Sequence, residues 1–245
     1  MKVFVTGRDS SEVIDVISEY KHFSIDDRNP ELIIAHGGDG TLLTAERLFP
    51  GIPKLPVRDM KNSVRCRKHF SLKKYIDSFL NNKLQKSELI KIAGIKENEK
   101  LVGLNDIFIH NVDRGGALRY LVYLDGIPYG HEIIGDGAGI ATVHGSTAYY
   151  RSITHSIFKI GIGLAFNNST EVTNHLVLPE DTEIKIKLTR GPAVLVADNS
   201  PEQIEINEGE EVILKKINEK AYIYGLEEFM CEKCRKLRHH KRLQN

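Results

Sequence analysis

The sequence has 245 residues, of which 41% are hydrophobic and 27% charged, so it can bury a substantial core and is not expected to be disordered. The formal net charge of +1 gives no indication of a nucleic-acid or membrane-surface partner. No apolar run is long enough to span a bilayer. Three cysteines, an odd number, argue against a secreted disulfide framework, so we expect a cytoplasmic protein.

Residues 1–90 alternate between strand-like and helix-like patterns. Apolar runs at 3–5 and 32–35 predict strands, and the second run has the continuous hydrophobicity of a buried parallel strand. Apolar residues on one side predict helices over 10–20, 42–48 and 72–80. This succession predicts an α/β domain with an open, mostly parallel sheet.

From about residue 89 the pattern changes to short β-type runs separated by Gly, Pro, Asn and Asp. We therefore predict an N-terminal α/β nucleotide-binding domain over 1–92 and a β-rich domain over 93–225. A C-terminal helix over 226–245 is expected to pack back on the first domain. The strands predicted for the second domain are 101–102, 106–109, 118–124, 140–143, 182–188, 193–196, 203–206 and 211–216.

The strongest local signal is the loop 36–41, His-Gly-Gly-Asp-Gly-Thr, between a predicted strand and a predicted helix. Glycines let the backbone turn sharply and let a ligand approach the main chain. Successive N–H groups at a helix N-terminus favour an anion, so the loop is typical of a phosphate site. Its glycine spacing matches neither the Walker A loop nor the dinucleotide fingerprint.

Asp39 lies inside this loop, where a carboxylate repels phosphates unless it binds Mg²⁺ or accepts a proton from the attacking hydroxyl. Either role indicates phosphoryl transfer. The alternative is an Asp-Gly turn in which Asp39 only caps a helix beginning at Leu42.

Two further segments carry small and polar residues suited to a nucleotide. Asn105 and Asp106 precede an apolar run, and residues 135–149 form a long stretch of glycines, hydroxyls and an aspartate. Such residues let a base or ribose lie against the backbone and supply specific hydrogen bonds. A simple turn between strands is the alternative for each segment, and for Asn105-Asp106 the two interpretations are equally good.

In this order the segments closely resemble the NAD kinase family: GGDGT at 37–41, Asn-acidic at 105–106, and GDG with GSTAY at 135–149. Leu-Val-Leu-Pro at 176–179 and Val-Ala-Asp at 196–198 add to the resemblance, which extends from about residue 31 to 226. The GGDG loop alone would also be compatible with lipid and sphingoid-base kinases.

The resemblance implies a cleft between two domains in which the γ-phosphoryl of ATP, or polyphosphate in some members, passes to the 2′-hydroxyl of the adenosine ribose of NAD. It implies a divalent cation such as Mg²⁺ with ATP, and a homodimer or homotetramer. By motif, Asp39 is implied to orient or deprotonate the hydroxyl. The residues implied to line the phosphates are Gly37, Gly38, Gly40 and Thr41. Those implied to contact the ribose and adenine of NAD are Asn105 and Asp106. The rest of NAD is implied to be surrounded by Asp136, His144, Thr147, Ala148, Tyr149, Ser152 and Asn199, and Asp136 is able to reach in from a neighbouring subunit.

The chain also departs from the family pattern at the ligand. Asp106 stands where the family usually has Glu, and His144 stands where a small hydroxyl is expected. The family's Asn-x-Gly-x-Leu-Gly-Phe stretch is replaced by residues 60–67. These changes leave two alternatives open, a kinase of the same fold that acts on a sugar, polyol or lipid hydroxyl, and a nucleotide-binding regulator without catalysis.

Two further groups of residues have the composition of a functional site, one basic and one with possible metal ligands. Lys61, Arg65, Arg67 and Lys68 offer positive charge for phosphates, or form a solvated loop. Cys231, Cys234, His239 and His240 match the residue types of a zinc site, but the short spacing favours a helical cysteine pair with a basic tail. We therefore predict no metal-ligating residues.

Overall fold

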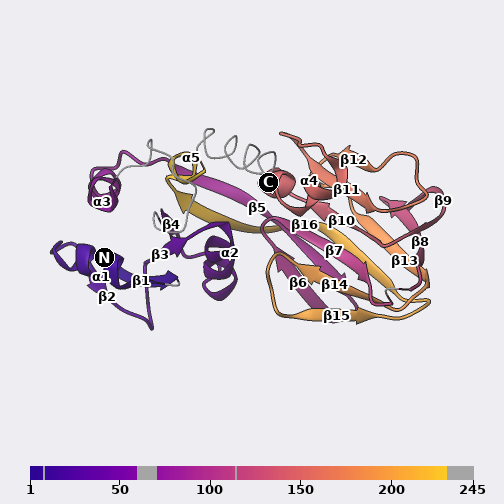
Figure 1. The fold of residues 1–245 in the computed structure, drawn as a ribbon, viewed down its shortest axis with the longest axis horizontal. Coiled ribbons are helices and arrows are strands. Elements are labelled where there is room, and N and C mark those ends of the chain that lie inside the picture. The colour runs from indigo at the N-terminus through magenta and orange to yellow at the C-terminus, as the bar shows by residue number, and fades with distance from the viewer. Residues whose placement is uncertain (8, 60–70, 114, 231–245) are drawn as a thin grey trace. The chain divides into compact units, whose positions relative to one another are not determined.

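The computed structural model describes residues 1–7, 9–59, 71–113 and 115–230 (Figure 1). The chain divides into two compact units, one formed by Met1–Leu89 with Ala221–Asn245 and the other by Ile90–Lys220. The predicted domain boundaries lie a few residues further along the chain and stay predictions. The C-terminal stretch predicted as helix is described only as far as α5, Leu226–Phe229, and Met230; the remainder lies outside the described residues.

The first unit is a three-layer α/β structure. Its strands follow the order β2-β1-β3-β4 with parallel pairing, and the end of β16 adds in parallel to β4. The prediction of a mostly parallel sheet is thus confirmed. The elements are β1 (Lys2–Gly7), α1 (Ser11–Ser18), β2 (Ser24–Ile25), β3 (Leu32–Gly37), α2 (Asp39–Leu48), β4 (Lys54–Arg58) and α3 (Leu72–Leu80).

Both faces of this sheet are covered, which explains the unbroken apolar run of β3. Leu32 and Ile34 pack with residues of α1 and α3, such as Val13 and Ile76, on one face. Ile33 and Ala35 pack with α2 on the other face. A parallel strand with helices on both faces must be apolar at every position.

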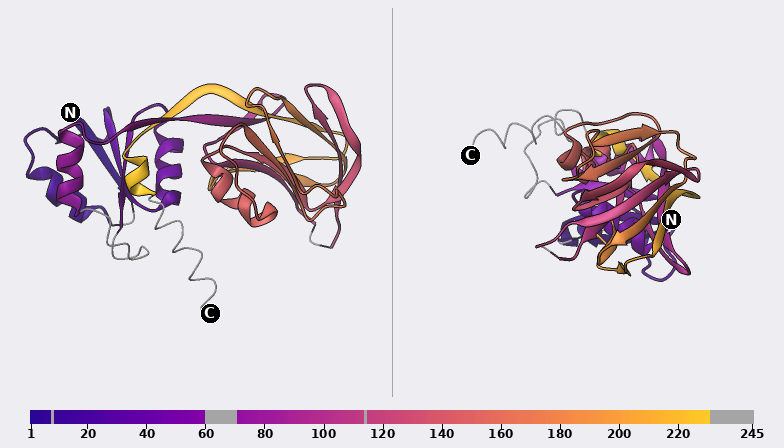
Figure 2. Two further views of the ribbon diagram at one scale, coloured as in Figure 1. Left: turned by 90° about the horizontal axis from the view of Figure 1, so that it is seen from above. Right: turned by 90° about the vertical axis from the view of Figure 1, so that its right-hand side faces the viewer.

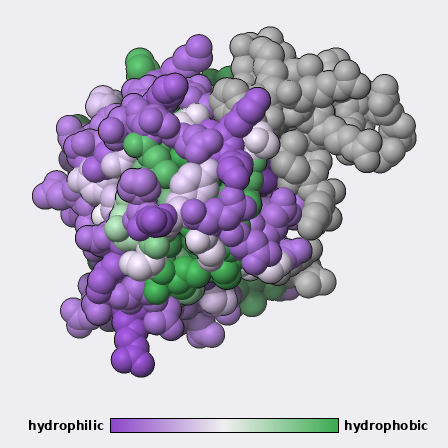
Figure 3. Space-filling model, turned by 90° about the vertical axis from the view of Figure 1, so that its left-hand side faces the viewer, coloured by the Kyte–Doolittle hydropathy of each residue, from purple (hydrophilic) through white to green (hydrophobic). Residues whose placement is uncertain are grey.

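Figure 3 shows the surface on the left-hand side of Figure 1, where hydrophilic residues surround hydrophobic ones near the middle.

The second unit is β-rich, as expected. Its six-stranded antiparallel sheet has the order β12-β11-β10-β7-β14-β15. Antiparallel strands β16, β13, β8 and β9 form a second layer, and β5 pairs with β6. The strands are β5 (Lys86–Lys96), β6 (Glu99–Gly103), β7 (Asp106–Asn111), β8 (Leu118–Leu124), β9 (Ile127–Gly135), β10 (Gly137–Ala141), β11 (Ile162–Asn167), β12 (His175–Leu178), β13 (Ile184–Arg190), β14 (Ala193–Ala197), β15 (Gln203–Ile206) and β16 (Glu211–Tyr224).

Alternation along β7 decides which residues of the six-stranded sheet can reach a ligand. Ile107 and Ile109 belong to the core that the two layers share. Figure 2 shows the strands of these layers as ribbons. Phe108 points to the opposite face, where it packs with Tyr150 of α4 (Tyr149–Thr154) and with Phe158. The side chain of Asp106 is on the Phe108 face because side chains alternate along a strand. Among the described residues, no helix has the length and apolar character needed to cross a membrane.

Candidate functional site

The glycine-rich loop lies at the carboxyl end of β3. Because β1, β3 and β4 are parallel and adjacent, Gly7, Gly37 and Arg58 end their strands at the same edge of the sheet. Ligands of open α/β sheets bind outside this edge. The first N–H groups of α2 also have no partner within the helix, as at any helix N-terminus. The loop therefore has the geometry of an anion site.

Helix α2 begins at Asp39, three residues earlier than predicted, and its N-cap is Gly38. The alternative in which Asp39 caps a helix beginning at Leu42 is therefore wrong. Asp39 lies in the first turn, where the helix dipole favours a negative charge. Its side chain is 28% exposed although its Oδ1 is buried, so solvent or a ligand can reach only the rest of the side chain.

The two adjacent glycines of the loop serve different purposes. Gly37 has φ +158°, and a Cβ there would lie 2.2 Å from Oγ1 of Thr41. Gly38 has φ −112°, and a Cβ there would have nothing within 4 Å. Glycine at 37 thus avoids a clash with Thr41, whereas the side of Gly38 is open space in which a ligand can approach the main chain.

This difference predicts a large loss of stability for one alanine variant and a small change for the other. Gly37→Ala should lower the free energy of unfolding by about 1–3 kcal/mol, because the methyl group overlaps Thr41 and the backbone is strained. Gly38→Ala should change it by less than about 1 kcal/mol, because a weaker N-cap offsets a less flexible unfolded chain. Urea denaturation of both variants measures this, and equal stabilities would contradict the assignment.

Arg58, at the end of β4, was not among the predicted site residues. Its Nη2 lies 4.0 Å from Oδ1 of Asp39, and its side chain is 10% exposed. Nε and Nη2 also donate to the carbonyl of Phe229 at 3.0 and 2.9 Å, and the guanidinium lies 4.7 Å from the centre of the Phe229 ring. Predicting strand β4 from the sequence would have pointed to Arg58, since the carboxyl ends of the parallel strands lie side by side at the glycine loop. Lys61, Arg65, Arg67 and Lys68 lie outside the described residues.

A second group of residues, which includes the predicted Asn105 and Asp106, lies where central strands of the six-stranded sheet begin or end, in the second unit. Asp106 begins β7 and pairs with Ala141 at the end of β10. Ala197, at the end of β14, pairs with Ile107 on the other side of β7. Asn105, Thr142 and Asp198, which flank these strand ends, therefore come together although they are far apart in the sequence.

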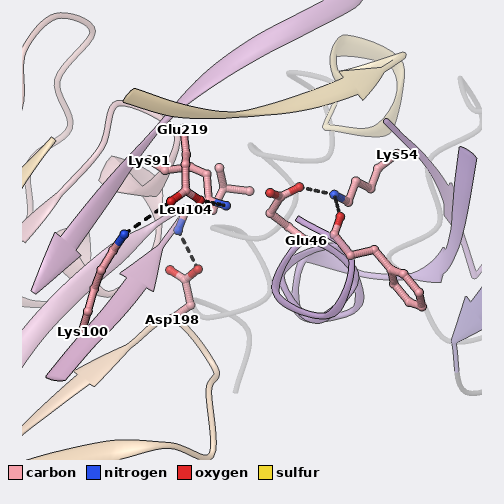
Figure 4. A network of polar contacts seen from close by, with 8 residues as sticks. Glu46, Lys54, Lys91, Lys100, Leu104, Asp198 and Glu219 are labelled. Atoms are coloured by element: carbon pink, nitrogen blue, oxygen red, sulfur yellow. Dashed lines mark hydrogen bonds and ion pairs between the residues drawn. The ribbon is translucent and has the colours of Figure 1, made fainter. Parts of the chain in front are cut away.

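Asp198 organises the turn before β7 (Figure 4). Its Oδ2 accepts from the N–H of Leu104 at 2.7 Å, and its Oδ1 accepts from the N–H groups of Asn105 and Asp106 at 2.8 and 3.0 Å. On the other side of the turn, the N–H of Thr142 donates to the carbonyl of Asn105 at 2.8 Å. Oδ1 of Asn105 is buried and has no hydrogen-bond partner among the described residues.

Asp106 is 8% exposed. Burial, and then the negative charge of Asp198, raise the pKa of Asp106 to about 7, against a smaller opposite effect of the N–H of Tyr149. Burial also raises the pKa of Asp198, but the three N–H groups of the turn and the charge of Lys91 oppose it. The carboxyl of Asp106 can therefore exist in both forms near neutral pH.

Lys91 of β5 is a buried cation that the sequence analysis did not single out. It is 4% exposed, and its Nζ lies 3.5 Å from Glu219 of β16. Lys100 of β6 lies 3.3 Å from the other oxygen of Glu219 (Figure 4). The sequence gives no indication that this lysine is buried, because lysines are common in strands and only the fold brings Lys91 near Asp198.

The segment after β10 contributes more of the predicted residues. Tyr149 donates its N–H to Asp106, and its ring lies 5.0 Å from that of Phe108 and 5.5 Å from that of His110. His144 precedes the 3₁₀ turn Gly145–Thr147, and Ala148 precedes α4. Ser152 lies on α4 and Asn199 directly after Asp198, and both are exposed.

Asp136 does not lie at the same end of the strands as Asn105 and Asp106. It precedes β10, whose first residue pairs with His110, whereas the last pairs with Asp106. At about 3.4 Å per residue, the two ends of β10 are roughly 14 Å apart. Oδ2 of Asp136 accepts from Nδ2 of Asn168 at 2.9 Å. Within one chain, Asp136 thus lies at the opposite end of the strand from Asn105 and Asp106.

The part of the chain that the structure describes has no group of three or more His, Cys, Asp or Glu residues placed to hold a metal ion. Cys231, Cys234, His239 and His240, named as zinc candidates, lie outside it. Mg²⁺ is usually held by one or two carboxylates together with substrate phosphates. A single carboxylate at the glycine loop, that of Asp39, fits this mode of binding.

No model of a known protein family matches the sequence. An NAD kinase of Aquifex aeolicus is 30% identical over 200 residues, which are 76% of this chain and 72% of the relative. A bifunctional NADP phosphatase/NAD kinase of Methanococcus maripaludis is 28% identical over 229 residues, which are 86% of this chain but only 38% of the relative. The chain therefore spans less than half of the length of that relative.

Two solved structures share the fold. Yeast NADH kinase complexed with NADH has a TM-score of 0.78 at 18% identity, covering 93% of this chain and 84% of the yeast chain. An NAD kinase from Archaeoglobus fulgidus in complex with ATP has a TM-score of 0.77 at 16% identity, covering 96% and 98%. Together with the identity to the Aquifex enzyme, this shows that the chain belongs to the NAD kinase family of phosphotransferases, as a divergent member.

Proposed function

We propose that the chain transfers the γ-phosphoryl group of ATP to the 2′-hydroxyl of the adenosine ribose of NAD. The observation that carries the proposal is the junction of β3 and α2, where open space at Gly38 adjoins a first helical turn that contains Asp39. The relatives are NAD kinases, and the two similar structures are complexes with NADH and with ATP, which supports NAD and ATP as substrates.

In this proposal, the first unit binds the phosphoryl donor. The backbone at Gly37, Gly38, Gly40 and Thr41 holds the phosphates, and Mg²⁺, if bound with ATP, would supply positive charge to the transferring phosphoryl group. Asp39 orients the acceptor hydroxyl and accepts its proton. Because phosphoryl transfer depends mainly on positioning and charge neutralisation, few side chains need to take part in bond making.

The second unit binds the acceptor nucleotide in this proposal. The unpartnered Oδ1 of Asn105 is an acceptor for an amino or hydroxyl group, and Asp106 faces the same turn. Tyr149 lies over Phe108 and His110 and offers an aromatic surface next to them. The remaining predicted contacts are His144, Thr147, Ala148, Ser152 and Asn199.

We further propose a homodimer or homotetramer in the cytoplasm, as the family resemblance implies. The position of Asp136 supports an oligomer, because it lies at the far end of β10 from Asp106 and would have to reach the site of another subunit. Analytical ultracentrifugation, with and without NAD, measures the oligomeric state.

A different acceptor is the second candidate, favoured by Asp106 in place of Glu and by the replaced stretch at 60–67. The purified protein is incubated with ATP and Mg²⁺ and with NAD, NADH or simple polyols in parallel, and the products are identified by mass spectrometry. NADP as the main product supports the proposal. A phosphorylated polyol, or no product with any acceptor, would contradict it.

A further inference from the structure

Arg58 lies beside the glycine loop, on the face of the parallel sheet that α2 covers. It ends β4 and pairs with Gly37 at the end of β3, and the N–H of the following residue, Asp59, donates to the carbonyl of Gly37 at 3.4 Å. Because side chains alternate along a strand, Arg58 is on the same face of β4 as Lys54, which binds Glu46 of α2. The guanidinium therefore belongs to the junction of β3 and α2.

Helix α5 holds this guanidinium in one orientation. Nε and Nη2 of Arg58 donate to the carbonyl of Phe229 at 3.0 and 2.9 Å, and Cζ lies 4.7 Å from the centre of the Phe229 ring. The side chain of Arg58 is only 10% exposed. A planar group that is already bonded and packed loses little further conformational freedom when it binds a ligand.

One edge of the guanidinium remains available to a ligand. The N–H of Nε and one N–H of Nη2 bond the carbonyl of Phe229, which leaves the other N–H of Nη2 and both N–H groups of Nη1. In the described part of the chain, Nη1 has no hydrogen-bond partner. Nη2 lies 4.0 Å from Oδ1 of Asp39, which is longer than a hydrogen bond. The edge between Nη1 and Nη2 thus offers two parallel donors, the arrangement that binds two oxygens of a phosphate.

The charge of Arg58 is a second argument for an anionic ligand. An arginine stays positively charged at any physiological pH, and a charge with so little exposure is costly unless other groups compensate it. A neutral carbonyl and an aromatic ring do so only in part, and the carboxylate of Asp39 is 4.0 Å away. A phosphate at the glycine loop would supply the missing negative charge. The guanidinium would in turn offset the repulsion between that phosphate and Asp39.

We propose that Arg58 is a binding residue for the phosphoryl donor, with its Nη1–Nη2 edge on phosphate oxygens at the glycine loop and its other edge fixed by the carbonyl of Phe229. The backbone of the loop contributes N–H dipoles, whereas Arg58 contributes a full positive charge. That the donor is ATP rests on the proposed function, but the binding of a chain of phosphoryl groups by Arg58 does not.

The test is a calorimetric titration of the full-length protein with inorganic tripolyphosphate, and separately with ATP and Mg²⁺. Arg58→Gln should raise the Kd of both probes by about 10–100-fold, the usual effect of losing a charged hydrogen bond. Arg58→Lys should lose less, because it keeps the charge but cannot hold the carbonyl and two phosphate oxygens at once.

Arg28→Gln is the matched control. Arg28 is an exposed arginine of the same unit, and it precedes β3, so it lies at the opposite end of the sheet from the glycine loop. This variant removes the same charge from the unit and should bind both probes as the wild type does.

NMR of the wild type provides a second measurement that does not depend on the folding of any variant. The ¹⁵Nε–¹Hε resonance of Arg58, assigned through the carbons of its side chain, should shift during the tripolyphosphate titration and saturate with the calorimetric Kd. Saturable binding that leaves this resonance unchanged would overturn the proposal. An Arg58→Gln variant that unfolds at lower urea but binds both probes normally would also overturn it, because Arg58 would then only tether α5.

The outcomes also separate this inference from the proposed function. Binding of tripolyphosphate that depends on Arg58, without transfer from ATP to NAD, would overturn only the proposed function. Formation of NADP together with unchanged Kd values in Arg58→Gln would overturn only the role of Arg58. A wild type that binds neither probe would overturn both.

Discussion

Replacing Asp39 with Asn should lower kcat with ATP and NAD by about 10²–10⁴-fold, the usual contribution of a positioned general base. The amide keeps the shape of the side chain but cannot accept the proton of the acceptor hydroxyl. Affinity for NAD should be nearly unchanged, because the other predicted NAD contacts are in the second unit. Steady-state kinetics and calorimetry measure the two quantities separately.

A matched control is Asp15→Asn, an aspartate on the exposed side of α1 in the same unit. It removes the same charge from the unit without touching the glycine loop, and it should keep the kcat of the wild type. If Asp39→Asn turns over at the rate of this control, Asp39 has no part in the chemistry.

Replacing Lys54 with Met should lower the free energy of unfolding by about 3–5 kcal/mol, the usual cost of removing one partner from a buried ion pair. Lys54 is fully buried at the start of β4 and binds the carboxylate of Glu46, which is 2% exposed. Its Nζ also donates to the carbonyl of Phe49 at 2.6 Å, just after α2. Figure 4 shows the pair of Lys54 and Glu46. The substitution leaves Glu46 in the core without this ammonium group.

Two controls separate the buried pair from a general effect of losing a lysine. The double variant Lys54→Met with Glu46→Leu should recover most of the lost stability, because it removes both charges together. Lys73→Met breaks the exposed pair with Glu19, whose partners lie 2.6 Å apart at the surface, and should have little effect. Chemical denaturation measures all three, and a small loss in Lys54→Met alone would contradict the structural role.

The sequence predicted those elements whose pattern is local. Residues 72–80, 118–124 and 203–206 have the predicted bounds of α3, β8 and β15, because a regular pattern and polar flanking residues mark both ends. The long strands β5 and β16 were missed or cut short because they carry many lysines and glutamates. Helix α4 was missed because Tyr149–Thr154 is only six residues long and rich in aromatic and β-branched residues.

The same distinction applies to the candidate site. The glycine loop was predictable since strand, loop and helix are contiguous, and the structure places Asp39 in the first turn of α2. Arg58, Lys91 and Asp198 did not enter the predicted site, because strand pairing brings them to it from distant segments. Asp198 was visible within a family motif, but its bonds to the turn before β7 require the antiparallel pairing of β14 with β7.

The proposed function depends above all on the backbone of residues 37–41, which should bind a chain of phosphoryl groups. Backbone ¹H–¹⁵N NMR of the protein, titrated with ATP and Mg²⁺ in the absence of an acceptor, tests it most directly. The amides of Gly38, Gly40 and Thr41 should show the largest shifts, and Gly38→Ala should weaken binding because its methyl group enters the open space beside the loop. Saturable ATP binding that shifts other amides and leaves these unchanged would contradict the claim.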